Sequence, residues 1–152
     1  MAKLICGIDP GMSGAFALLA DGELVEVADM PIIEVNGKRR LNAAAAAEIV
    51  IRFNAAFTVI EAVSAMPKQG VASTFAFGYA AGVLEGLHAA LGRAILMVRP
   101  NIWKREAAVP ADKNAARMMA TRLWPDHANL FARVKDDGRA EAALLARWGM
   151  TK

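Results

Sequence analysis

Residues 4–15 read LICGIDPGMSGA, and this stretch decides the fold that the sequence predicts. A run of apolar residues leads into Asp9, and Pro10-Gly11 then turns the chain. Such a run, closed by a turn, is typical of a buried central strand, which we predict over Lys3–Asp9. An isolated buried carboxylate is costly, so an acid at this strand end requires a cation, a hydrogen-bond network or a solvent-facing position. Asp9 is therefore the first candidate functional residue.

Two further strands are predicted directly after this one. Gly14–Ala20 is a second apolar run, and it closes at Asp21-Gly22, a dipeptide typical of two-residue hairpin turns. Glu23–Met30 alternates polar and apolar residues, as expected for a strand with one wet face. We interpret Pro31–Arg40, which contains Asn36-Gly37 and then three consecutive basic residues, as a loop.

The rest of the chain alternates helices with two short strands. We predict strands at Thr58–Glu61 and Ala94–Val98, and helices from the cap Asn42 to Phe53, at Ser73–Leu91 and Asn101–Ala107, from the cap Asp112 to Trp124, and at Asp137–Trp148. Meandering strands followed by β-α-β crossovers imply an α/β fold, a mixed sheet with helices on its faces. Glycines at positions 78, 82 and 86 predict the close approach of another element to the second helix.

Length and composition narrow the class of protein. The 152 residues fit a single domain over residues 1–152, and 56% hydrophobic residues are enough to fill a core. Cys6 is the only cysteine, which excludes an intrachain disulfide and a cysteine-cluster zinc site. No apolar run approaches the roughly 20 residues of a membrane helix. We therefore expect a soluble cytoplasmic protein without a membrane partner.

The net charge of +3 conceals an asymmetry along the chain. Residues 1–92 contain six Lys or Arg and nine Asp or Glu, whereas residues 93–152 contain twelve and six. A basic half joined to a more acidic one favours a polyanionic partner, and nucleic acid is the first candidate. Basic helices are also commonly solvated faces, so charge alone leaves both interpretations open.

Four acids occupy positions that this fold would bring together. Glu61 ends its strand as Asp9 ends the first, so both carboxylates would emerge at one sheet edge if the strands are neighbours. Asp137 and Glu141 are four residues apart and share one helical face. Carboxylates converging in this way are what a two-magnesium nuclease site requires. Each acid alone also has a structural interpretation, as a turn residue, a helix cap or a surface ion-pair partner, and the joint pattern favours the metal site.

Five segments, in order, resemble the RuvC-type Holliday junction resolvases, which belong to the ribonuclease H-like superfamily. Residues 4–15 resemble the first strand of this family, and the last segment resembles its phage and prophage-like members in particular. The other segments are VIEAVSAMPKQG (59–70), FGYAAGVLEG (77–86), VRPNIWK (98–104) and, at the end, DDGRAEAALLA (136–146). The resemblance spans about Leu4 to Trp148. It implies a ribonuclease H-like mixed five-stranded sheet flanked by helices.

The resemblance also implies an activity. Members of the RuvC-type family are homodimers that bind a four-way DNA junction and nick two opposed strands. They use Mg²⁺ or Mn²⁺, with two ions in each active site. Asp9 and Glu61 match the first and second catalytic and metal-binding acids, and Glu141 matches the last. In typical bacterial members the final two acids are three residues apart, which here would fall on Gly138. Asp137 lies four residues before Glu141 and on the same helical face, so we assign the fourth acid to Asp137 in preference to Asp136.

Three lysines are candidates for DNA binding. Lys104 and Lys113 match positions where the family has lysines near the DNA backbone, and both could otherwise be solvated helix lysines. Lys68 follows Met66 and Pro67, where the family has a loop that probes the junction. We interpret Trp103, Trp124 and Trp148 as core anchors, and Phe75, Phe77 and Tyr79 as core or dimer-interface residues.

Three other functions remain open at this point. One is a ribonuclease H-like nuclease that cuts RNA–DNA hybrids or other branched substrates, and a second is a junction-binding protein without catalysis. The third is an actin-like nucleotide-binding module, which the short chain disfavours. The resolvase hypothesis predicts a nucleoid-associated protein, and it leaves a chromosomal or a phage origin of the gene open.

Overall fold

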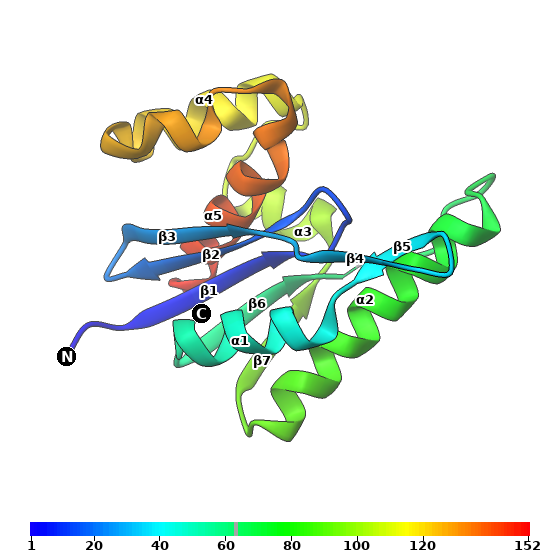
Figure 1. Cartoon of the computed structure of the whole chain (residues 1–152). Coiled ribbons are helices and arrows are strands. Elements are labelled where there is room, and N and C mark those ends of the chain that lie inside the picture. The colour runs from blue at the N-terminus through cyan, green and yellow to red at the C-terminus, as the bar shows by residue number, and fades with distance from the viewer. Residues whose placement is uncertain (63) are drawn as a thin grey trace.

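The computed structural model describes residues 1–62 and 64–152 and is built on a five-stranded sheet (Figure 1). The strand order is β3-β2-β1-β6-β7. The first three strands form an antiparallel meander, and β6 and β7 run parallel to β1. The bounds are β1 Leu4–Asp9, β2 Ala15–Ala20, β3 Glu23–Asp29, β6 Phe57–Glu61 and β7 Ala94–Val98. The predicted mixed α/β sheet is confirmed.

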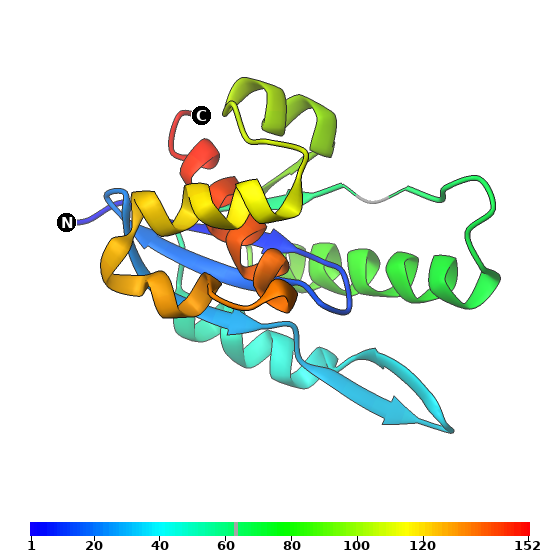
Figure 2. The same ribbon diagram turned by 90° about the horizontal axis from the view of Figure 1, so that it is seen from above.

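Helices cover both faces of this sheet (Figures 1 and 2). Alternate residues of β1 point to opposite sides, so Ile5 packs with α4 and α5 in one core, and Ile8 packs with α1 and α2 in the other. The helices are α1 Ala43–Phe53, α2 Val71–Ala90, α3 Pro100–Glu106, α4 Lys113–Leu123 and α5 Asp137–Gly149. Two 3₁₀ segments, Pro125–Phe131 and Val134–Asp136, precede α5. No helix among the described residues is both long and apolar enough to cross a membrane.

The interpretation of Pro31–Arg40 as a loop is wrong. This segment forms most of a hairpin, β4 (Ile32–Val35) and β5 (Lys38–Leu41), which makes a separate two-stranded sheet. Asn36 and Gly37 both have positive φ, 54° and 72°. A two-residue turn with this geometry matches the twist of antiparallel strands, so the dipeptide closes a hairpin even where the flanking residues are charged.

The glycines of α2 do not have the predicted close neighbour within the described structure. A Cβ atom at Gly78, Gly82 or Gly86 would meet no atom within 4 Å. The close approach is instead at Gly7 of β1, where a Cβ atom would overlap the Ala142 carbonyl oxygen and lie 2.5 Å from the Ala146 amide nitrogen. Helix α5 therefore lies directly against the central strand.

Candidate active site

The structure brings the four predicted acids to one edge of the sheet. Strands β1 and β6 are parallel neighbours, with Ile8 paired with Ile60, so Asp9 and Glu61 leave the sheet side by side. Asp137 and Glu141 lie on the first turns of α5, which the close approach at Gly7 places over the end of β1. The negative charges of both helix acids act on Asp9. Four carboxylates from three elements that are distant in sequence thus form one cluster.

Burial and mutual repulsion raise the pKa values of the two strand-end acids, Asp9 and Glu61. Burial raises the pKa of Asp9 to about 6, with further contributions from the Glu141 and Asp137 charges, although a 3.0 Å hydrogen bond from the Gly11 amide opposes the rise. Burial also raises the pKa of Glu61 to about 7, and the charge of Asp9 adds to this effect. Raised pKa values of carboxyl groups that lie close to one another are typical of functional sites.

Two of the predicted DNA-binding lysines lie in this cluster. Lys104 Nζ is 2.7 Å from Glu141 Oε1, and Lys113 Nζ is 2.7 Å from Asp137 Oδ2. The Lys104 side chain is 21% exposed, whereas the Lys113 side chain is 72% exposed. The hydrogen bond from Lys113 to Asp137 raises the pKa of this lysine. Both ammonium groups therefore offset part of the negative charge of the acids.

Lys68 lies elsewhere, in residues 64–70 before α2, where its side chain is exposed. The loop is shaped by a turn in which the Gln69 amide donates to the Met66 carbonyl and the Gln69 side chain accepts from the Met66 amide, both at 3.0 Å. Within the described residues Lys68 has no ion-pair contact with the acids. The structure therefore does not place Lys68 in the cluster of acids.

Trp103 contributes to the site in a way that the sequence interpretation missed. The residue is fully buried, as predicted for a core anchor, but its indole Nε1 also donates a 2.9 Å hydrogen bond to Glu61 Oε2. This bond favours the charged form of Glu61 and thus lowers its pKa against the effect of burial. A buried indole N–H needs a hydrogen-bond acceptor, and this requirement could have indicated from the sequence that Trp103 has a polar partner.

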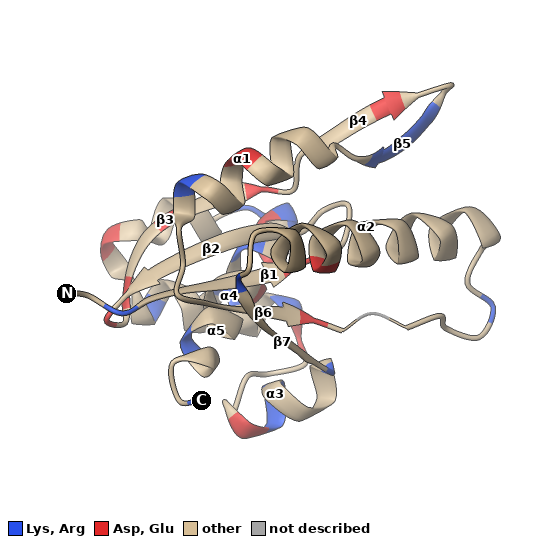
Figure 3. Ribbon diagram, turned by 90° about the horizontal axis from the view of Figure 1, so that it is seen from below, with Lys and Arg blue, Asp and Glu red and all other residues tan. Residues whose placement is uncertain are grey.

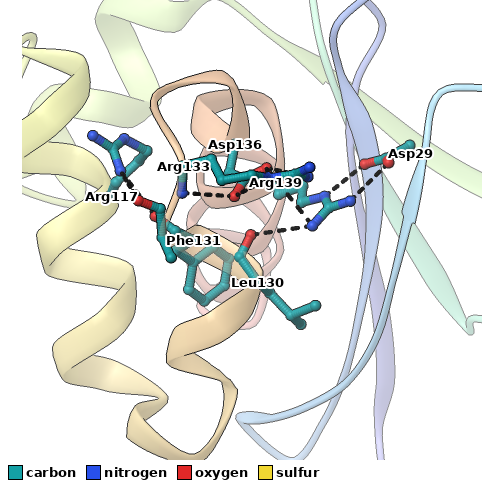
Figure 4. A network of polar contacts seen from close by, with 8 residues as sticks. Asp29, Arg117, Leu130, Phe131, Arg133, Asp136 and Arg139 are labelled. Carbon is teal, nitrogen blue, oxygen red and sulfur yellow. Dashed lines mark hydrogen bonds and ion pairs between the residues drawn. The ribbon is translucent and has the colours of Figure 1, made fainter.

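The contacts of Asp136 and Asp137 show which of these two acids belongs to the cluster. Asp136 is 1% exposed and accepts hydrogen bonds from the Arg133 guanidinium and amide, and Arg139 lies 3.7 Å away (Figure 4). Although burial alone would raise it, these partners hold the pKa of Asp136 below its usual range. Arg139 also binds Asp29 of β3, which ties the start of α5 to the sheet. Asp136 is thus fully engaged in a structural network, and Asp137 is the acid that faces the cluster.

The donor set of the cluster suits a hard divalent cation. Mg²⁺ and Mn²⁺ prefer carboxylate oxygens, and four carboxylates lie at this edge of the sheet. Across residues 1–62 and 64–152, no three His, Cys, Asp or Glu side chains form a ready-made metal-binding group. In this structure Glu141 and Asp137 are instead paired with Lys104 and Lys113.

The Trp103 contact can be tested with a matched control. Trp103→Phe keeps the buried ring and removes the donor to Glu61, so metal affinity should fall about 10- to 100-fold, as is usual when a ligand loses its outer partner. Trp148→Phe removes an equivalent 2.9 Å bond to Glu106, which is remote from the acids, and should leave metal affinity unchanged. Calorimetric titration of both variants with Mn²⁺ gives the answer. Equal affinities would show that the Trp103 bond is purely structural.

Comparison with known proteins supports the fold. No protein-family model and no curated protein matches the sequence. The chain is similar to T. thermophilus RuvC in complex with a Holliday junction substrate, at 18% identity and a TM-score of 0.64, covering 95% of this chain and 91% of that one. A second structure of Thermus thermophilus RuvC matches at 18% identity and a TM-score of 0.59, covering 95% and 92%. The ribonuclease H-like fold of RuvC, which the sequence predicts, is therefore confirmed.

Proposed function

We propose that this chain is a metal-dependent endonuclease that resolves four-way DNA junctions by paired nicks. The observation that carries the proposal is the juxtaposition of Asp9 and Glu61 with the two acids of α5. The shared fold supports the choice of substrate, because the T. thermophilus protein was solved with a Holliday junction. The proposed place of action is DNA in the cytoplasm.

The four acids would hold two Mg²⁺ or Mn²⁺ ions. Bound ions of this kind activate the attacking water and stabilise the leaving oxygen of a phosphodiester. Asp9 and Glu61 from the strand ends, and Asp137 and Glu141 from α5, would supply the carboxylate oxygens that hold these ions. The Trp103 indole would keep Glu61 oriented and charged.

The two lysines of the cluster would change partners when the site is loaded. Their ammonium groups offset carboxylate charge in this structure, at 2.7 Å from Glu141 and Asp137. Once cations satisfy these acids, Lys104 and Lys113 become available to the scissile phosphate, and Lys68 would contact the backbone near the junction centre. Each phosphate contact of this kind adds to the salt dependence of binding.

We also propose a homodimer, because paired nicks require two sites. Helix α2 is apolar along most of its length, yet only Ala80, Leu84 and His88 are buried, and Val71 and Phe75 are largely exposed. With its glycines open, this helix offers a flat surface for α2 of a second copy. Sedimentation at micromolar concentration should show twice the mass of one chain, and a monomer would contradict the proposal.

A substrate panel separates the proposed function from its rivals. With Mg²⁺ the protein should nick a four-way junction on two opposed strands and leave linear duplex intact. Cleavage of linear RNA–DNA hybrids without junction cleavage would select the hybrid nuclease. Tight junction binding without nicks under either Mg²⁺ or Mn²⁺ would select a binding protein.

Neighbouring acids at the start of α5 should respond differently to the same change. Asp137→Asn should lower cleavage by at least about 100-fold with little change in stability, because it removes a proposed metal ligand. Asp136→Asn should instead lower the free energy of unfolding by about 3 kcal/mol, since it breaks a buried ion pair. Thermal unfolding and nicking of both variants provide the comparison. Loss of cleavage at unchanged stability in Asp136→Asn would reverse the assignment.

A further inference from the structure

We propose that the β4–β5 hairpin is a second phosphate-binding surface, at which Lys38 and Arg39 hold the backbone of a DNA arm outside the catalytic cluster. The inference rests on the proposed function and extends it to a segment that the sequence interpretation assigned to a loop. It depends on three properties of the hairpin, which are its anchoring, its unpaired charge and its position.

The hairpin is held firmly at its base. Leu41, the last residue of β5, is 2% exposed and belongs to the core between the sheet and α1. The Arg40 guanidinium lies 5.3 Å from the centre of the Tyr79 ring on α2, within the range of a cation–π contact. The tight turn at Asn36-Gly37 joins the two strands at the far end. The cations near this turn are therefore presented by an ordered element, so little ordering is needed when they bind.

The hairpin has three cations and one acid, so it keeps a net positive charge. Lys38, Arg39 and Arg40 are all exposed, and the hairpin has a single acid, Glu34, which lies opposite Arg39 in the strand register. None of the three cations forms an ion pair within the described residues. Arg40 is occupied by Tyr79, which leaves Lys38 and Arg39, on opposite faces of β5, to contact an anion along the hairpin edge.

The position of the hairpin matches the location of the acids. Its tip projects past the end of the sheet toward which β1 runs, where Asp9 and Glu61 emerge, and the loop with Lys68 projects at the same end on the other side of α2 (Figures 2 and 3). Residues 1–92 contain only six Lys or Arg, and four of them lie on these two projections. Cations are scarce in this half of the chain and gather where DNA entering the site would extend.

Exposed cations at the opposite end provide a matched control. Lys3 precedes β1, and Arg147 lies in the last turn of α5, where Gly149 packs against Ile5 and Val59. We would measure binding of a labelled four-way junction in EDTA over a range of salt for the wild type, Lys38→Gln/Arg39→Gln and Lys3→Gln/Arg147→Gln. Lys38→Arg/Arg39→Lys, which keeps both charges, completes the set. Thermal unfolding of each variant confirms that it is folded.

The hairpin variant should lose about 2 from the slope of log affinity against log salt, because each phosphate contact contributes about 0.9. A fourfold rise in salt should then weaken the wild type about tenfold more than this variant. The control and the charge-preserving variant should keep the wild-type slope. An unchanged slope in the hairpin variant overturns the inference, and the hairpin would then face solvent or a protein partner. An equal loss of slope in Lys3→Gln/Arg147→Gln also overturns it, because the effect would then come from the overall charge of the protein. Nicking by the same wild-type preparation with Mg²⁺ tests the proposed function separately.

Discussion

Asp9→Asn should abolish cleavage and at the same time make the protein more stable at pH 8. Cleavage should fall by about 1,000-fold or more, because a shared metal ligand contributes several kcal/mol to the transition state. Junction binding should persist, since the proposed phosphate contacts come from other residues. Stability should rise because the variant no longer has to ionise a carboxyl group that burial disfavours.

The sign and size of the stability change follow from the pKa of Asp9. Its value of about 6 in the folded protein lies above the ordinary value of 3.8, so the folded state binds the proton more tightly than the unfolded chain does. Ionisation of Asp9 therefore lowers the free energy of unfolding as the pH rises from about 4 to about 6. Above pH 6 the full loss is about 2–3 kcal/mol. Relief of this penalty should raise the melting temperature by several degrees at pH 8 and hardly at all below about pH 4.

An exposed acid provides the control for this experiment. Glu23→Gln changes a carboxylate on the surface, at the start of β3, and should alter neither cleavage nor the melting temperature. Mg²⁺ should stabilise the wild type and Glu23→Gln, because a ligand that binds only the folded state raises stability, but it should stabilise Asp9→Asn much less. An Asp9→Asn protein that is less stable than the wild type at pH 8 would show that the carboxylate is a structural partner.

Metal affinity should increase steeply with pH between about pH 5 and 7 and level off above that range. Carboxylates must lose their protons to ligate a cation, and the pKa values of Asp9 and Glu61 are about 6 and about 7. Below both values, binding of metal releases two protons, so affinity should rise about 100-fold per pH unit. Between them one proton is released, and the rise should be about tenfold per unit.

Calorimetric titration of the metal-free protein with Mn²⁺ measures this dependence. Titrations in buffers of different ionisation heat count the released protons directly. Glu61→Gln removes one of the two groups, so its affinity should be lower and its proton release should fall by about one at low pH. Affinity that is constant from about pH 5 to 8 would contradict the assignment of these acids as ligands.

Local sequence signals were sufficient for most of the fold and for part of the site. Apolar runs that end in an acid placed Asp9 and Glu61 at strand ends, and the parallel pairing of β1 and β6 then brings them together. The Asn42 cap was recognisable because its side chain satisfies the Ala45 amide at the start of α1, at 3.2 Å. Such features depend on neighbours a few residues away and can therefore be predicted from a single sequence.

Other features depend on contacts between distant segments. Asp136 and Asp137 are adjacent and chemically identical, and they differ in their partners: Asp137 pairs with Lys113 of α4, whereas Asp136 pairs with Arg133 and Arg139. The bond from Trp103 to Glu61 joins residues 42 positions apart. The regular spacing of glycines in α2 indicated a packed face, but no atom of the described residues packs against that face. The spacing of small residues shows that a helix face could accept a close neighbour, whereas the tertiary structure determines which segment, if any, packs there.

Strand-mapped nicking of a four-way junction with Mg²⁺, for the wild type beside Asp9→Asn, tests the central claim most directly. The claim is that the acid cluster at the ends of β1, β6 and α5 cuts branched DNA with a bound metal. The predicted result is a pair of nicks on opposed strands that requires Mg²⁺ and disappears in Asp9→Asn, while that variant still binds the junction. Nicks that persist in Asp9→Asn, or a wild type that binds the junction and never cuts it, would contradict the claim.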